Sequence, residues 1–350
     1  MLFPPENCPR IVVKIGSALL VDAAGGVRRA WLEGIAADIA ERVAAGQQVA
    51  VVSSGAIALG ARRLNLPKGG RASLEDAQAA AATGQIALGH TWAEVLAARG
   101  LTAAQILVTL DDLEDRRRYL NAAATLGRLL QLGVVPIINE NDSVATAEIR
   151  FGDNDRLAAR VAQAAGAQGV VLLSDIDGLY DRNPALPGAL HIARVERIDA
   201  GVAAMADTGS ASGMGSGGMV SKIQAARIAT GAGAALAIAS GRIDRPLSAE
   251  ARHTIFTPEK RKRARKAWLA GRLTAKGAIQ VDAGAAQALA AGRSLLAAGA
   301  TGVTGRFARG DVVTIEGPDG AIARGLAEYD AAEAQSLLGR RSKEHEAILG

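Results

Sequence analysis

The chain has 350 residues, of which 49% are hydrophobic and 21% charged, and this length favours two domains over one small core. Its formal net charge of +5 suits either an anionic substrate or nucleic acid, while the single cysteine, Cys8, excludes an intramolecular disulfide. The first residues lack the order of a secretory signal, and no apolar run approaches the roughly 20 residues of a membrane span, so we expect a cytoplasmic protein without a membrane partner.

The first part of the chain alternates short β-branched runs with helical patterns. Positions 11–15 predict a buried strand, and positions 30–45 predict a helix because apolar residues recur there every four positions. Gly46 ends this helix, and a second buried strand is predicted over 49–53. The helix–glycine–strand unit then recurs, with further strands predicted over 134–139, 170–173 and 235–239. Strands buried on both faces and separated by helices predict an α/β fold, with an open, largely parallel sheet sandwiched by helices.

The pattern changes near residue 257. A basic run occupies positions 260–266, and short strand-like pieces between glycine turns follow over 310–315 and 321–325. These changes predict three parts. They are a catalytic domain over 1–260, a basic linker over 261–276 and a small β-rich, barrel-like domain over 277–350.

Small and polar residues follow several of the predicted strands. Ser54 and Gly55 follow the second strand, the segment 139–142 ends the third, and Ser174 and Asp175 follow the fourth. In open α/β sheets, ligands bind beyond the carboxyl ends of the strands. Ordinary turn chemistry would explain any one of these segments, whereas their agreement favours a binding site.

Two lysines stand where an anion would explain them. Lys14 interrupts an apolar strand, where an unpaired ammonium group is unfavourable; the alternative is that its stem carries the charge to the surface. Lys222 follows the glycine-rich segment 212–218 in the first turns of a helix that begins near Met219. Glycines and a helix start both favour anion binding, and they would compensate a lysine that the helix dipole disfavours. The alternative for this segment is a flexible linker.

Three polar side chains precede the helix that begins near position 154. Asp153, Asn154 and Asp155 exceed what a single N-cap needs. We expect Asp155 to hold Lys14 and Lys222 in place, and Asp153 with Asn154 to face a ligand.

Other catalytic classes fit the sequence poorly. The letters G-x-G-x-x-G at 213–218 follow a loop rather than a strand, which argues against a dinucleotide site, and the Walker A and protein-kinase motifs are absent. The four histidines are not at metal-ligand spacing, so no protein-held metal is predicted. Two lysines, an anion cradle and no histidine base suit phosphoryl transfer, and in particular transfer to a carboxylate, which is ionised at neutral pH and needs no base.

Taken together, these segments resemble the amino-acid kinase family, and the tail after Gly277 resembles a PUA domain. The resemblance covers nearly the whole chain and rests on positions 12–17, 53–57, 139–142, 152–155, 173–180 and 215–219. The motifs are closer to members that act on glutamate than to those that act on aspartate, carbamate, uridylate or acetylglutamate. The resemblance therefore implies ATP-dependent phosphorylation of the L-glutamate side-chain carboxylate, which gives γ-glutamyl phosphate and opens proline biosynthesis.

The resemblance also implies roles for individual residues. The catalytic residues would be Lys14, Lys222 and Asp155. The residues that bind glutamate would be Ser54, Gly55, Asp142, Asp153 and Asn154. The residues that bind ATP would be Lys14, Ser174, Asp175, Ser216, Gly217, Gly218, Met219, Val220, Ser221 and Lys222. Mg²⁺ would bridge the ATP phosphates, with no protein ligand named.

As partners, the resemblance implies proline as a feedback inhibitor, a homo-oligomer, and a γ-glutamyl phosphate reductase that receives the labile product. The alternative function is an RNA-binding protein that acts through the PUA-like tail and the basic run 260–266. Aromatic residues that could stack on bases are scarce in that half of the chain, so nucleic acid is not the expected partner.

Overall fold

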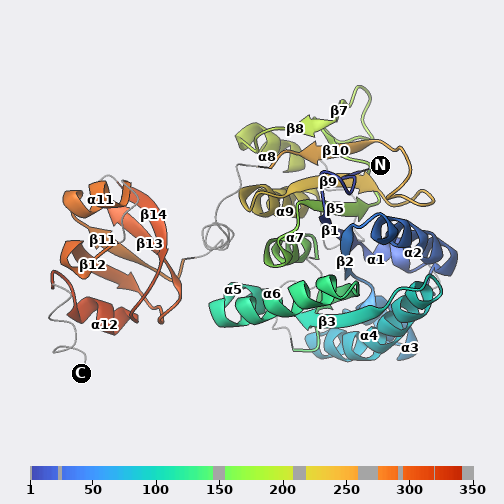
Figure 1. Ribbon diagram of the computed structural model, residues 1–350, viewed down its shortest axis with the longest axis horizontal. Helices are drawn as coiled ribbons and strands as arrows, with labels where there is room; N and C mark the ends of the chain where they lie inside the picture. Colours follow the sequence, from blue (N-terminus) through green and yellow to red (C-terminus); the bar gives the residue numbers. More distant parts are fainter. Residues whose placement is uncertain are drawn as a thin grey trace. The chain divides into compact units, whose positions relative to one another are not determined.

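The computed structural model describes residues 2–22, 26–144, 154–207, 218–258, 275–290, 295–318 and 320–340. The chain forms two compact units (Figure 1), and the main division along the sequence falls between Lys262 and Arg263. Most of the predicted linker 261–276 lies outside the described residues, so the limits of the three predicted parts stay predictions.

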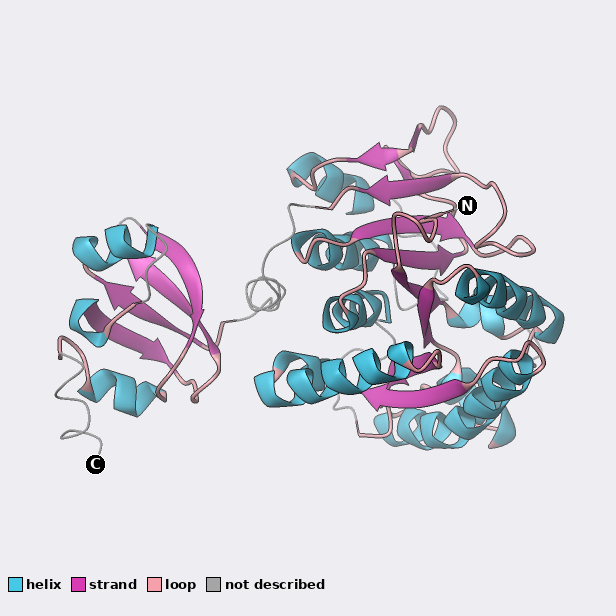
Figure 2. Ribbon diagram, viewed as in Figure 1, coloured by secondary structure: helices cyan, strands magenta, loops and turns pink. Residues whose placement is uncertain are grey.

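An eight-stranded sheet with helices on both faces forms the larger unit (Figure 2). Its spatial order is β3-β4-β2-β1-β5-β9-β10-β8. The strands of this unit are β1 (Arg10–Ile15), β2 (Gln48–Ser53), β3 (Ala103–Val108), β4 (Val135–Glu140), β5 (Gly169–Ser174), β6 (Leu179–Tyr180), β7 (His191–Ile192), β8 (Arg194–Val195), β9 (Ala235–Ser240) and β10 (His253–Phe256). The helices are α1 (Ser17–Leu20), α2 (Arg29–Ala44), α3 (Ala56–Arg63), α4 (Leu74–Ala97), α5 (Leu110–Glu114), α6 (Arg116–Gln131), α7 (Asn154–Ala165), α8 (Ala200–Asp207) and α9 (Met219–Gly231), with a 3₁₀ turn η1 (Pro67–Gly70).

The sheet has a hydrophobic core on each face. Along β1, Val12 packs in the core beneath α6, α7 and α9, whereas Val13 and Ile15 pack in the core beneath α2 and α4. This alternation follows from the two-residue period of a strand and explains why the strand sequence is apolar throughout. Each neighbouring pair from β3 to β9 is parallel, while β10 runs antiparallel to β9. The predicted α/β fold with a largely parallel sheet is confirmed.

Helices α3 and α4 lie unusually close together because glycines face each other between them. A Cβ added to Gly84 would lie 1.8 Å from the carbonyl oxygen of Ala56, and one added to Gly60 would lie 1.8 Å from that of Ala80. Neither helix can therefore carry a larger residue at these contacts without moving. This packing fixes the position of the residues that follow Ser54 and of those near Gln85.

We expect Gly84→Ala to lower the free energy of unfolding by about 2 kcal/mol, because the added methyl group overpacks a backbone contact. Gly127→Ala in α6 is the matched control, since no described atom lies within 4 Å of the added Cβ. That variant should gain up to about 1 kcal/mol from the higher helix propensity of alanine. Chemical denaturation of both variants measures the difference, and equal effects at the two positions would contradict the packing argument.

The smaller unit contains a separate sheet in the order β12-β11-β13-β14. Its elements are β11 (Gly277–Val281), α11 (Ala283–Ala290), the 3₁₀ turn η2 (Ala297–Gly299), β12 (Ala300–Gly305), β13 (Val312–Gly317), β14 (Gly320–Leu326) and α12 (Ala331–Ser336). Phe307, Val313 and Ala327 form its core, and Asp330 and Glu333 form a capping box that starts α12. Across both units, no helix within the described ranges is long and apolar enough to cross a membrane.

Candidate active site

Three charged side chains from different elements meet at the carboxyl end of the central strands. Lys14 shares a face of β1 with Val12, which is the face that α7 and α9 cover. Asp155 lies in the first turn of α7, and Lys222 lies in the first turn of α9. Each helix runs back along the sheet before the parallel strand that follows it, so both helix starts lie at the carboxyl edge of the sheet.

Asp155 contacts both lysines. Lys14 Nζ lies 2.7 Å from Asp155 Oδ1, and Lys222 Nζ donates to Asp155 Oδ2 at 3.0 Å. The Asp155 side chain is 1% exposed, and those of Lys14 and Lys222 are 10% and 6% exposed. Burial by itself raises the pKa of Asp155, but the two ammonium groups outweigh it and hold the pKa below its usual range. The ionised carboxylate can therefore keep two like charges side by side.

Among the described residues, nothing blocks the start of α9 from an anion. Gly218 is exposed, and no described atom lies within 4 Å of the position that a Cβ would take there. No described side chain caps the helix, whose first N–H groups point toward its amino end. Met219 packs against the core and Val220 is exposed, so the backbone rather than these side chains would face a ligand. Ser221 lies between Val220 and Lys222, partly buried.

The strand next to β1 ends in the pair predicted to bind ATP. Ser174 is the last residue of β5 and is buried, and its Oγ donates to Asp175 Oδ1 at 3.1 Å. Asp175 is exposed, and its carboxylate lies 3.8 Å from Arg242 Nη2, just after β9. Polar groups at the ends of neighbouring parallel strands thus lie at the same sheet edge as Lys14.

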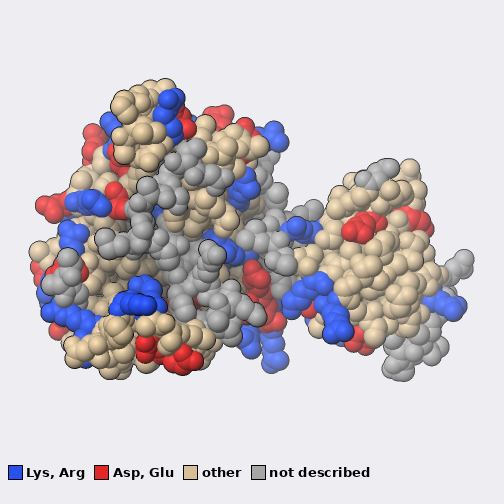
Figure 3. Space-filling model, turned by 180° about the vertical axis from the view of Figure 1, so that it is seen from behind, with Lys and Arg blue, Asp and Glu red and all other residues tan. Residues whose placement is uncertain are grey.

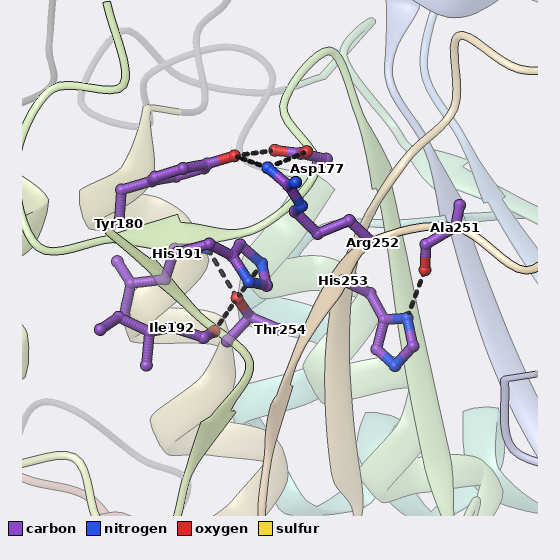
Figure 4. Close-up of polar contacts among 9 residues, drawn as sticks. Asp177, Tyr180, His191, Ile192, Ala251, Arg252, His253 and Thr254 are labelled. Carbon is purple, nitrogen blue, oxygen red and sulfur yellow. Dashed lines mark hydrogen bonds and ion pairs between the residues drawn. The ribbon is translucent and has the colours of Figure 1, made fainter. Parts of the chain in front are cut away.

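Polar contacts join the segment that follows β5 to the strand β10 (Figure 4). Tyr180 Oη donates to Asp177 Oδ1 at 2.9 Å, and Arg252 Nη1 donates to the same hydroxyl group at 3.1 Å. Thr254 Oγ1 accepts from the Leu179 N–H at 2.7 Å. These contacts fix the loop that follows the predicted ATP-binding pair.

Ser54 and Asn154 contact each other beside the lysines. Asn154 Nδ2 donates to Ser54 Oγ at 2.6 Å and to Asn139 Oδ1 at 3.0 Å. Gly55, next to Ser54, caps α3 with a φ of 117°, and a Cβ there would lie 2.8 Å from Leu20 Cδ2. Only glycine fits this conformation and this contact, so Gly55 sets the direction in which the chain leaves β2 toward α3.

Asp142 borders a cavity of about 460 Å³ next to this cluster. The cavity is lined by residues of α3, α4 and β3, by the last residue of β4 and by the segment after it, among them Gln85, Gln105 and Glu140. Asp142 is 7% exposed, and no described residue hydrogen-bonds its Oδ1 atom. Burial raises the pKa of Asp142 to about 6, against a smaller lowering by Arg71. A buried acidic group at a cavity wall is suited to a cationic ligand.

The predicted site residues that the structure describes form three groups, and a fourth group lies outside the described residues. Lys14, Lys222 and Asp155 meet directly. Asn154 contacts Ser54, which Gly55 follows, and Asp142 lines the cavity. Ser174, Asp175 and residues 218–221 lie at the end of β5 and the start of α9. Asp153, Ser216 and Gly217 lie outside the described residues. Two residues joined to Asn154 by hydrogen bonds are not predicted as site residues: Asn139, which accepts from Asn154, and Gln85, which accepts from Asn139. Asn139 lies in a segment that the sequence does single out, whereas Gln85 lies among the alanines of α4 and carries no sequence signal.

Known proteins resemble the chain over its full length. The model of the amino acid kinase family matches residues 9–240, and that of the PUA domain matches residues 277–349. A glutamate 5-kinase of Sphingopyxis alaskensis is 76% identical over 100% of this chain and 95% of its own length. A glutamate 5-kinase of Novosphingobium aromaticivorans is 65% identical over 99% of this chain and 93% of its own. Among solved structures, an isopentenyl phosphate kinase aligns with 71% of this chain and 100% of its own at 18% identity and a TM-score of 0.48.

These similarities do not favour the alternative of an RNA-binding protein. On the face of the larger unit that Figure 3 shows, basic side chains are interspersed with acidic ones among the described residues. Nucleic-acid binding typically uses basic residues gathered in one patch. The alternative rested on the PUA-like tail and on the basic run 260–266, and this run lies outside the described residues.

Proposed function

Because the chain belongs to the amino acid kinase family, we propose that it transfers the γ-phosphoryl group of ATP to the side-chain carboxylate of L-glutamate. Family membership confirms the resemblance predicted from the sequence, and the relatives named glutamate 5-kinase support the choice of acceptor. The observation that carries the proposal is the contact of Lys14 and Lys222 with one buried carboxylate at the carboxyl edge of the sheet. The reaction would open proline biosynthesis.

The chemistry requires positioning and charge neutralisation more than a base. A glutamate side chain has a pKa of about 4.3, so its carboxylate is already a nucleophile at neutral pH. A carboxylate oxygen forms a bond to the γ-phosphorus, while the bond from that phosphorus to the β–γ bridging oxygen breaks and ADP leaves. Lys14 and Lys222 neutralise the oxygens of the transferring group, and Asp155 orients both ammonium groups.

We assign the amino-acid end of glutamate to Ser54, Gly55, Asp142, Asp153 and Asn154. Asn154 uses its amide hydrogens on protein oxygens, so its Oδ1 is the atom that remains for a ligand. This oxygen and the Asp142 carboxylate are acceptors that suit the α-ammonium group. Ser54 Oγ accepts from Asn154 and keeps its own hydrogen, which suits the α-carboxylate.

We assign ATP to the end of β5 and the start of α9, through Lys14, Ser174, Asp175 and the segment 216–222. The first N–H groups of α9 support this because they favour the negative charge of phosphates. Mg²⁺ suits the ATP phosphates, with which it usually binds through few protein ligands, and when bound it supplies further positive charge. The described part of the chain contains no group of three metal-ligating side chains, and we assign Mg²⁺ no protein ligand.

The proposal extends to the setting of the enzyme. We infer a cytoplasmic homo-oligomer that is inhibited by proline at the glutamate site. Its acyl phosphate is labile, which supports transfer to γ-glutamyl phosphate reductase. These inferences rest on the family resemblance.

An ADP-release assay with hydroxylamine trapping tests the proposed function. The acceptors to compare are L-glutamate, L-aspartate, N-acetylglutamate, carbamate and UMP. We expect glutamate to give both ADP and a hydroxamate, because only an acyl phosphate reacts with hydroxylamine. ADP release with another acceptor and none with glutamate would refute the assignment.

Asp142 predicts a dependence of glutamate binding on pH. Its carboxyl group has a pKa of about 6, raised by burial, so it is ionised above that pH and loses its charge below it. The KM for glutamate should therefore rise roughly tenfold as the pH falls from about 7 to about 5, while the KM for ATP changes little. Asp142→Asn should have a high KM for glutamate at every pH in this range. A wild-type KM that does not change with pH would contradict the role of Asp142.

A further inference from the structure

A chain of amide hydrogen bonds runs from the cavity wall to Ser54. Asn154 Nδ2 donates to Ser54 Oγ at 2.6 Å and to Asn139 Oδ1 at 3.0 Å. Asn139 Nδ2 donates in turn to Gln85 Oε1 at 2.9 Å, and Gln85 Nε2 donates to Gln105 Oε1 at 3.3 Å. The amides come from α7, β4, α4 and β3, so the chain joins elements that are far apart in the sequence.

Every amide in this chain donates in the same direction, from Asn154 toward Gln105. A primary amide has a donor nitrogen on one arm and an acceptor oxygen on the other. If one member turned over alone, nitrogen would face nitrogen or oxygen would face oxygen at its contacts. The amides therefore reverse their orientations together or not at all. The direction of the hydrogen bonds at one end determines whether a nitrogen or an oxygen atom is presented at the other end.

In the observed direction of the hydrogen bonds, the end of the amide chain at α7 presents acceptor atoms. Asn154 is 2% exposed, and no described residue donates to its Oδ1. Asp142, three residues after Asn139, likewise has a buried oxygen without a donor among the described residues. Buried acceptors normally have donors, so these two atoms indicate a ligand that supplies them. An ammonium group has three donors and no acceptor, so it can supply a donor to either atom.

We propose that Gln85 is a positioning residue that selects the α-ammonium group of the substrate, an inference that rests on the proposed function. By accepting from Asn139, Gln85 maintains the direction in which Asn154 Oδ1 faces the substrate. In the reverse direction Asn154 would present N–H groups, which repel an ammonium. Gln85 is 7% exposed, and its backbone is fixed because Gly84 packs directly against α3.

Gln85→Met tests this role, because methionine keeps the length of the side chain but removes the acceptor. We expect the KM for glutamate to rise about tenfold, as for the loss of a hydrogen bond to a charged group, while the KM for ATP is unchanged. Glutarate is glutamate without the α-amino group, so its inhibition constant should be the same in the variant and the wild type. Gln85→Glu should restore the KM for glutamate, since a carboxyl oxygen can accept from Asn139 in either protonation state.

Gln48→Met is the matched control. Gln48 is a half-buried glutamine at the amino end of β2, and its amide donates to the Leu130 carbonyl at 3.0 Å. Its loss should leave the KM for glutamate and the inhibition constant of glutarate unchanged. Two outcomes would overturn the inference. One is an equal rise of the KM for glutamate and the inhibition constant of glutarate in Gln85→Met. The other is a KM for glutamate in Gln85→Glu as high as that in Gln85→Met. If Gln85→Met does not fold, the KM of Gln85→Glu decides alone. A wild-type protein that does not phosphorylate glutamate would refute the proposed function instead.

Discussion

Lys222→Ala is expected to lower kcat for glutamate phosphorylation by about 10³-fold, because it removes one of two cations that neutralise the transferring phosphoryl group. The fold should persist, since alanine is a good helix former at this position in α9. Lys14→Ala should have an effect of similar size. The double variant should be little worse than either single variant, because the two ammonium groups act as a unit on the same group.

Lys276→Ala is the control for this prediction. The Lys276 side chain is 61% exposed in the smaller unit and pairs with Asp311 at 3.2 Å, so its removal changes the total charge by the same amount outside the unit that contains the site. Its kcat should equal that of the wild type. The assay is ADP release at saturating glutamate and ATP, with circular dichroism to verify folding. Wild-type rates for both Lys14→Ala and Lys222→Ala would remove these residues from the mechanism.

The positions of the two lysines are largely predictable because they depend on strand and helix periods. Lys14 interrupts an apolar strand, and Lys222 follows a glycine-rich segment at a helix start. Both signals are local, and the rule that ligands bind at the carboxyl edge of a parallel sheet then brings them together. Strand β10, which runs antiparallel to β9, is not among the predicted strands.

The amide chain is not predictable from the sequence. Gln85 lies in α4, where successive alanines leave no clear apolar stripe, and the helix itself is absent from the predicted elements. Its partner Asn139 is 54 residues away, so the contact depends on how closely α4 packs on its neighbours. Gly60 and Gly84 set the separation of α4 from α3, and their role is visible only when the facing backbone is known.

Asp155→Asn is expected to lower the free energy of unfolding by about 3 kcal/mol, because it leaves two nearly buried ammonium groups without their carboxylate. The pKa of Asp155 is lowered in the folded state, so the stabilisation by its carboxylate is fully present above the unfolded-state pKa of about 3.9. It is lost as the pH falls through the folded-state value. The difference between wild type and variant should therefore persist at neutral pH and shrink in acid.

A non-hydrolysable ATP analogue separates this effect from a purely structural one. Its phosphates would replace the lost negative charge beside Lys14 and Lys222, so the analogue should raise the melting temperature of Asp155→Asn more than that of the wild type.

Asp38→Asn is the matched control. Asp38 is fully buried, pairs with Arg245 at 2.9 Å and accepts from Ser248, and these contacts involve neither Lys14 nor Lys222. That variant should be destabilised but should gain no more from the analogue than the wild type does. Equal gains in the two variants would show that Asp155 does not hold the phosphate-binding cations.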